Sequence, residues 1–128
     1  MKDFHYTRSS QRSVVEALEI VQKASVQENF GVLHVHDVRE TLKKKGFDTP
    51  PAFIVEICKP EVAQKLIQVD PLVLLFLPCK IAIFSEGGET VISALTTAVP
   101  EHYLPGVDFS EFHPGIEQSL RNIVDAAR

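Results

Sequence analysis

Two apolar segments joined by a pair of glycines constrain the fold most strongly. The segments Cys79–Phe84 and Thr90–Thr96 are rich in isoleucine, valine and threonine, and residues 86–89, Glu-Gly-Gly-Glu, lie between them. β-Branched residues favour strands, and paired glycines accept the positive φ angles that a tight hairpin turn needs. The sequence therefore predicts an antiparallel hairpin as part of a sheet.

Helices that can cover this sheet are predicted by capping boxes and apolar stripes. Ser13 and Glu16 form an S-x-x-E capping box, after which apolar residues recur at spacings of three and four. Asp37 and Glu40 form a second box, of the D-x-x-E kind, and Pro60 suits the first position of another short helix. The stripes are Val14, Ala17, Leu18, Val21 and Ala24 in the first helix, and Ile116, Leu120, Ile123, Val124 and Ala127 in the last.

Three further segments are interpreted as strands from their alternation and β-branched content: Lys2–Thr7, Phe30–His36 and Ala52–Cys58. Leu72–Leu77 fits either a buried turn of helix or a buried strand, and Pro100–Gly106 is predicted to be irregular. With 128 residues, of which 45% are hydrophobic, the chain suits a single domain over residues 1–128. The predicted fold class is α+β: a two-layer sandwich with a mostly antiparallel, mixed sheet of about five strands and helices packed on one face.

A sheet covered on one face leaves the other face open. Such a face attracts a second subunit, so we expect a homodimer. The net charge of −4 argues against a nucleic-acid partner, because that binding normally rests on clustered Lys and Arg. The basic run Lys43–Lys45 has a local role, since cations are favoured in the last turn of a helix.

Three observations predict a cytoplasmic location and no membrane segment. Met1–Ser10 lacks the apolar stretch of a secretory signal. The longest unbroken apolar run, Leu72–Leu77, is far shorter than the roughly 18 residues that span a bilayer. Two cysteines, Cys58 and Cys79, are too few for a secreted disulfide framework and fit a reducing compartment.

The short motifs that mark many enzymes and nucleotide sites do not occur in this chain. G-x-G-x-x-G, the Walker loop, G-x-S-x-G and H-E-x-x-H are all missing, so no cofactor is predicted. The segment Pro100–Pro114, which holds His102, Tyr103, Asp108 and His113, is long enough to border a pocket or to cover one end of the core.

Cys79 is a candidate for thiol chemistry. It opens a predicted strand next to Lys80, and a thiol in an electropositive place is a nucleophile or a soft metal ligand. The alternative is a core position, because Cys79 shares its strand face with Ile81 and Ile83, whereas Lys80 points to the other face. Both interpretations stay open.

Cys58 and Glu56 share one face of another predicted strand. A carboxylate beside a thiol raises the thiol pKa and weakens it as a nucleophile. If the strands of Cys58 and Cys79 are neighbours, the two thiols could close a reversible disulfide, provided that their Cα atoms lie within about 7 Å. Cys79, Cys58, Glu56 and Lys80 are thus the candidate ligand-binding residues.

His34 and His36 lie two residues apart on a predicted strand and therefore project from the same face. This spacing can place two imidazoles on one metal ion, but zinc needs a third and a fourth ligand. His102, His113 and Glu56 are available in principle, and nothing in the sequence brings them together. Two histidines on a solvated sheet face are the alternative, and no metal is assigned.

Several short stretches together resemble the domain-of-unknown-function 302 family over roughly residues 2–98. They are FGVL from Phe30, TLKKKGFD from Thr41, FIVEICKP from Phe53, Asp70-Pro71, and LPCKIAIF from Leu77. LPCK after ICKP is the most specific part. The resemblance implies a small prokaryotic α+β protein, dimeric and without an established reaction. Asp37 matches the family pattern, whereas His34 and His36 look particular to this chain.

Two functions from different classes follow from these observations. The first is a non-catalytic homodimeric domain that binds a small apolar molecule or a protein partner, which fits the lack of catalytic motifs and the apolar sheet. The second is a thiol protein in which Cys79, with or without Cys58, carries sulfur, a soft metal or a redox equivalent. The reactivity of Cys79 distinguishes them, because a buried thiol favours the first function.

Overall fold

The fold is an antiparallel sheet with helices on one face. The computed structural model describes residues 3–112 and 115–128. The strands are β1 (His5–Ser10), β2 (Gly31–Asp37), β3 (Ala52–Cys58), β4 (Cys79–Glu86) and β5 (Glu89–Leu95). The helices are α1 (Val14–Gln27), α2 (Val38–Lys43), α3 (Pro60–Val69), α4 (Ala98–Tyr103) and α5 (Ile116–Ala127), with 3-10 helices η1 (Pro71–Leu75) and η2 (Phe109–Phe112).

The strands are arranged in the order β1-β5-β4-β3-β2, and every neighbouring pair is antiparallel. β4 and β5 form the predicted hairpin, in which Gly87 and Gly88 adopt φ angles of 58° and 81°. The order places β1 and β2 at the two edges of the sheet. The sequence predicted a mixed sheet with mostly antiparallel pairing, whereas the pairing among the described residues is entirely antiparallel.

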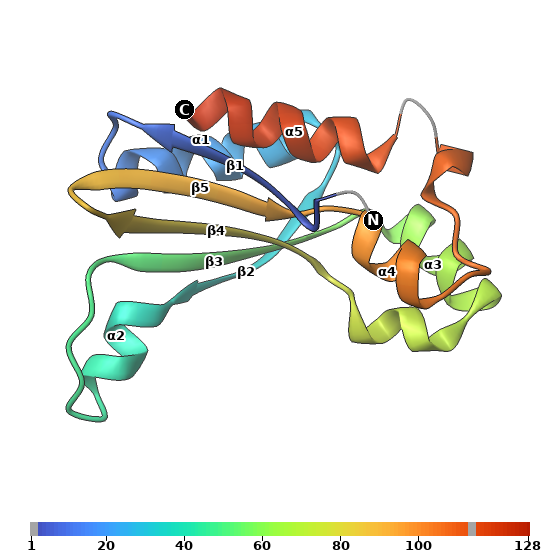
Figure 1. Ribbon diagram of the computed structural model, residues 1–128, viewed down its shortest axis with the longest axis horizontal. Helices are drawn as coiled ribbons and strands as arrows, with labels where there is room; N and C mark the ends of the chain where they lie inside the picture. The colour runs from blue at the N-terminus through green and yellow to red at the C-terminus, as the bar shows by residue number, and fades with distance from the viewer. Residues whose placement is uncertain (1–2, 113–114) are drawn as a thin grey trace.

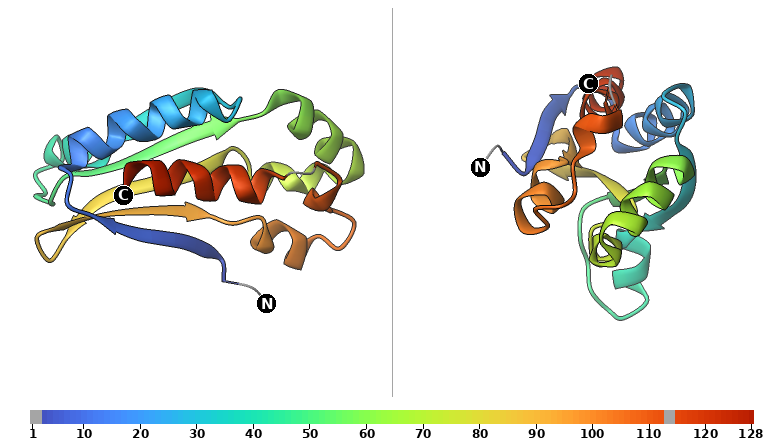
Figure 2. Two further views of the ribbon diagram at one scale, coloured as in Figure 1. Left: turned by 90° about the horizontal axis from the view of Figure 1, so that it is seen from above. Right: turned by 90° about the vertical axis from the view of Figure 1, so that its right-hand side faces the viewer.

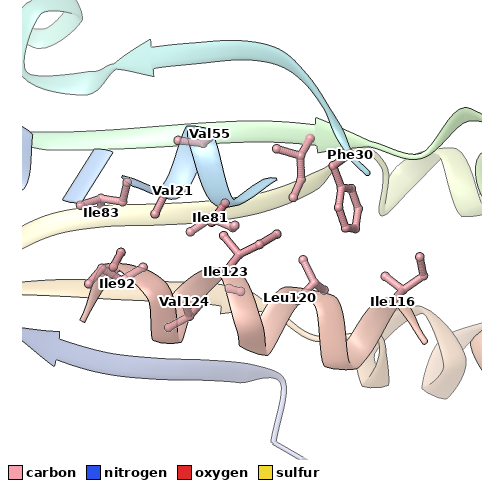
Figure 3. Packing of buried hydrophobic residues seen from close by; sticks show 14 of the residues in the cluster. Val21, Phe30, Val55, Ile81, Ile83, Ile92, Ile116, Leu120, Ile123 and Val124 are labelled. Atoms are coloured by element: carbon pink, nitrogen blue, oxygen red, sulfur yellow. The ribbon is translucent and has the colours of Figure 1, made fainter. Parts of the chain in front are cut away.

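Helices α1 and α5 lie side by side over one face of the sheet, while α2 lies at one end and α3 and α4 at the other (Figures 1 and 2). Side chains from α5 point at the inward residues of the central strands (Figure 3). Ile81, Ile83 and Ile92 have no exposed surface. Burying a side chain of this size contributes about 1.5–3 kcal/mol. The predicted two-layer α+β sandwich is confirmed.

The predicted caps explain where two of the helices begin. The backbone N–H of Glu16 donates to Ser13 Oγ at 3.1 Å before α1, and that of Glu40 donates to Asp37 Oδ1 at 3.0 Å before α2. Each bond satisfies a donor that has no partner within its own helix.

The structure corrects two local predictions and resolves one segment that the sequence left open. The first strand lies three residues later than Lys2–Thr7, because β1 pairs with β5 from His5 to Ser10. Pro100–Gly106 is not wholly irregular, since Ala98–Tyr103 is helical; Pro100 falls in the first turn, where its missing N–H costs nothing. The ambiguous segment Leu72–Leu77 begins with the 3-10 helix η1 rather than a strand.

The face of the sheet away from α1 and α5 carries partly exposed side chains. Across β3, β4 and β5, Ile54 lies opposite Ala82 and Phe84 opposite Val91. We call this surface the open face. In the described part of the chain, no helix is long and apolar enough to cross a bilayer.

Candidate functional site

A groove of about 830 Å³ runs between the edge strand β1, the helix α5 and the segment that contains α4 and η2. Figure 2 shows β1 running alongside α5. The lining is mostly polar; its acidic and basic side chains are Asp3, Arg8, Glu101, Glu117 and Arg121, and His5 adds an imidazole. Its size suits a small-molecule ligand, because ligand pockets commonly enclose about 300–1,000 Å³.

Tyr6, on β1, is one of the residues that line the groove. The guanidinium carbons of Arg8 and Arg121 are 4.0 and 4.8 Å from the centroid of its ring. The Tyr6 hydroxyl donates to the Asp125 carboxylate, with oxygen distances of 2.9 and 3.1 Å. Cation–π contacts of this kind contribute about 0.5–1 kcal/mol each at exposed sites. The ring thus holds two cations from β1 and α5 beside the same groove.

Glu117 fixes the position of α5 against the end of β5. Its Oε1 accepts bonds from the backbone N–H and the hydroxyl of Thr97, each at 3.2 Å, and its Oε2 accepts from Arg121 Nε at 2.9 Å. Within the described residues, the terminal nitrogens of Arg121 have no hydrogen-bond acceptor. The carboxylate of Glu117 is therefore occupied by Thr97 and Arg121, whereas the terminal nitrogens of Arg121 remain available as donors in the groove.

The sequence alone did not point to Tyr6, Arg8 and Arg121 as residues of one site. The predicted first strand ended at Thr7, which excluded Arg8, although Tyr6 and Arg8 at a spacing of two share one face of the true strand. Arg121 is far from Tyr6 in the sequence, and its spacing of four from Glu117 indicates only a pairing within one helix.

Pro100–Pro114 was expected either to border a pocket or to cover one end of the core, and part of the segment does border the groove. Glu101, Phe109 and Ser110 line the groove, whereas Tyr103 stacks on Phe76 elsewhere. His113 lies outside the described residues, so its predicted contribution stays a prediction.

Cys79 opens β4 opposite Ile57 and packs against the core. Burial raises the pKa of its thiol from the ordinary 9.0 to about 11, and the opposing effects of Lys80 and Lys59 do not offset this rise. At pH 7 only about one Cys79 side chain in ten thousand is then a thiolate. This environment weakens Cys79 as a nucleophile.

Cys58 ends β3 and has a pKa raised by burial and then by the negative charge of Glu61. Glu56 is therefore not the carboxylate that most affects this thiol. The strands of the two cysteines are neighbours, but the register places Ile57, not Cys58, opposite Cys79. Because successive strand residues point to opposite faces, this register does not favour a disulfide, and both thiols are free.

Lys80 lies opposite Glu56 in the register between β3 and β4. Its amino group donates to the backbone oxygen of Pro78 at 3.2 Å, so it is directed along its own strand. The four candidate ligand-binding residues therefore do not form one cluster: Cys79 belongs to the core, whereas Glu56 and Lys80 belong to the open face.

His34 and His36 lie next to each other, as their spacing predicts, with ring centroids 4.3 Å apart. Glu56, which the sequence alone could not connect to them, approaches His36 with 2.7 Å between Oε1 and Nε2. Among residues 3–112 and 115–128, no three His, Cys, Asp or Glu side chains are grouped as a metal site. The histidines and Glu56 form a compact polar cluster at the margin of the open face.

Comparisons with known proteins agree with this fold. The family model described as a domain of unknown function, DUF302, matches residues 6–127. The crystal structure of an uncharacterized conserved DUF302 protein from Bacillus stearothermophilus is similar with a TM-score of 0.86 and 33% sequence identity, over 98% of each chain. No curated protein matches. The family match extends beyond the roughly 2–98 that the short stretches covered and reaches the end of α5, so this chain belongs to the DUF302 family.

Proposed function

We propose that this protein is a non-catalytic, homodimeric binding domain of the cytoplasm that holds a small polar molecule in the groove between β1 and α5. The observation that carries the proposal is the groove itself, with a volume of about 830 Å³ and a lining of hydroxyl, amide and charged groups. A few convergent polar groups in a concave site are what fix the orientation of a ligand. Arg121 offers charged donors, and a hydrogen bond to a charged group contributes about 1.5–3 kcal/mol.

The environment of Cys79 supports binding over thiol chemistry. A reactive cysteine needs a lowered pKa and access to solvent, whereas the pKa of Cys79 is raised to about 11 by burial. A thiol function would therefore need a change of structure that exposes this residue.

A ligand screen tests the groove. We expect at least one compound from a panel of sugar phosphates, nucleotides, amino acids and dicarboxylates to shift the amide resonances of Thr97 and Gln118. Arg121→Ala should lower the affinity for that compound by about tenfold or more, because the substitution removes a charged donor. Arg39→Ala, on the remote helix α2, is the matched control and should leave affinity unchanged. Shifts confined to other surfaces, or none with any compound, would contradict the proposal.

The open face supports the proposed homodimer. Ile54, Ala82, Phe84 and Val91 are partly exposed on it, and a sheet with one uncovered apolar face gains stability when a second layer covers it. A second copy of the chain supplies such a layer in a symmetric, self-complementary way.

A charge placed on the open face tests the dimer. We expect light scattering to give twice the mass of the 14.3 kDa chain for the unchanged protein and the monomer mass for Ala82→Arg. The reason is that two symmetry-related arginines would be buried without partners. Leu75→Arg, at a residue of η1 that is 76% exposed, is the control and should stay dimeric. A monomer in the unchanged protein at micromolar concentration would rule out the homodimer.

A further inference from the structure

A bulge in β2 decides which side chains reach the open face. Val32 lies opposite Ile57, but the next residue of β3, Glu56, lies opposite His34, so Leu33 is an extra residue in the ladder. One extra residue reverses the alternation of a strand. Val32 and Val35 therefore both face the covered side, while His34 and His36 emerge beside Glu56.

Without this bulge the same strand would present different groups. Leu33 and Val35 would lie on the open face with Glu56, and the two histidines would be directed at the helices. The bulge leaves Leu33 59% exposed, an unfavourable place for an apolar side chain. The bulge also places two imidazoles in contact with each other on an accessible edge strand. Bulges often direct side chains toward functional sites in this way.

The contact with Glu56 orients the ring of His36 in the way that is typical of a metal ligand. Glu56 Oε1 lies 2.7 Å from His36 Nε2, and because an ionised carboxylate only accepts hydrogen bonds, we assign the ring proton to Nε2. The lone pair of His36 then lies on Nδ1. Metal-binding histidines typically have their second ring nitrogen bonded to a carboxylate, which sets the orientation of the ring and strengthens it as a ligand.

We infer that His34 and His36 chelate a divalent transition-metal ion, with Glu56 as the carboxylate that orients His36 and with water in the other coordination positions. The two ring centroids lie 4.3 Å apart, so rotation about the side-chain torsions can bring one nitrogen of each ring within the metal–nitrogen distance of about 2.0–2.1 Å from a shared ion. Imidazole ligands select zinc, nickel and copper over magnesium and calcium. Water ligands make this a site for exchangeable metal rather than a closed structural centre.

The charges around the cluster are compatible with a cation. Glu56 contributes a negative charge at contact distance from His36, and Asp37 follows in the chain. Lys80 is the opposing charge, and its bond to Pro78 directs the amino group along β4. The cluster is distinct from the groove, which lies beside β1 at the other edge of the sheet.

Nickel titration of the untagged, full-length protein tests the inference. Ni²⁺ is suited to the test because it binds imidazole without oxidising the two thiols. We expect calorimetry at pH 7.5 to show one Ni²⁺ per chain. His34→Ala and His36→Ala should each weaken binding at least tenfold, and Glu56→Gln should cause a smaller loss, since an orienting carboxylate is altered while both ligands remain.

Two controls make the result decisive. His102→Ala, at an exposed histidine far from the cluster, should leave the affinity unchanged, and thermal melts should show that all variants are folded. Equal Ni²⁺ affinity in the double variant His34→Ala/His36→Ala would overturn the inference. A loss of binding in Cys58→Ser that matches the loss in the histidine variants would also overturn it, because the thiol would then be a ligand.

Discussion

Ile81→Ala is expected to lower the free energy of unfolding by about 3–4 kcal/mol, because the substitution leaves a cavity in the most enclosed part of the core. Ile81 has no exposed surface and lies on β4, the central strand of the sheet, between Val55 and Ala94. It faces α1 and α5 and packs among residues from both layers (Figure 3). The loss is a large fraction of the roughly 5–15 kcal/mol that stabilises an ordinary domain.

Urea denaturation at 25 °C measures this loss. Leu75→Ala is a matched apolar control, because Leu75 is 76% exposed and its truncation should change the free energy by less than about 0.5 kcal/mol. Similar losses for the two variants would mean that the helices do not cover the face that carries Ile81. Because both proteins remain dimeric in our proposal, the comparison must be made at one protein concentration.

Local patterns predicted most of the elements, because their causes lie within a few residues. The 52–58 segment is β3 with the predicted bounds, and the turn at Gly87 and Gly88 joins the predicted hairpin. Ser13 caps the start of α1, as predicted, and the predicted apolar stripe that ends at Ala127 lies on α5. In both helices the buried residues recur at the predicted spacings of three and four. Capping, turn chemistry and apolar periodicity all act over distances that a sequence window covers.

The sites depend on pairings between distant segments, which no local window contains. Arg121 meets Tyr6 only because α5 returns to lie beside the edge strand β1. Glu56 meets His36 only because β2 and β3 are neighbours and Leu33 is bulged. Strand order and bulges follow from how all the layers pack together. For this reason the histidine pair was visible in the sequence and its carboxylate partner was not.

Cys79 is expected to react with iodoacetamide at pH 7 at least 100-fold more slowly in the native protein than in the unfolded chain. The pKa rises from 9.0 to about 11, and each unit lowers the thiolate fraction tenfold. Mass spectrometry of a Cys58→Ser protein isolates the signal from Cys79. The native rate should rise about tenfold for each pH unit toward pH 11, since the thiolate is the reacting species.

Because the pKa of Cys79 is raised in the folded protein, the free energy of unfolding falls as the pH rises through the alkaline range. The folded protein holds the thiol proton more tightly than the unfolded chain, so the contribution of Cys79 to the free energy of unfolding is complete below pH 9 and is lost as the pH rises through about 11. The loss is about 3 kcal/mol at most. Because lysines and tyrosines also titrate there, the measured quantity is the difference between the unchanged protein and Cys79→Ala. Rapid labelling of Cys79 in the native protein, with an apparent pKa below the ordinary value, would contradict the buried environment of this thiol. The thiol function would then be favoured over the binding function.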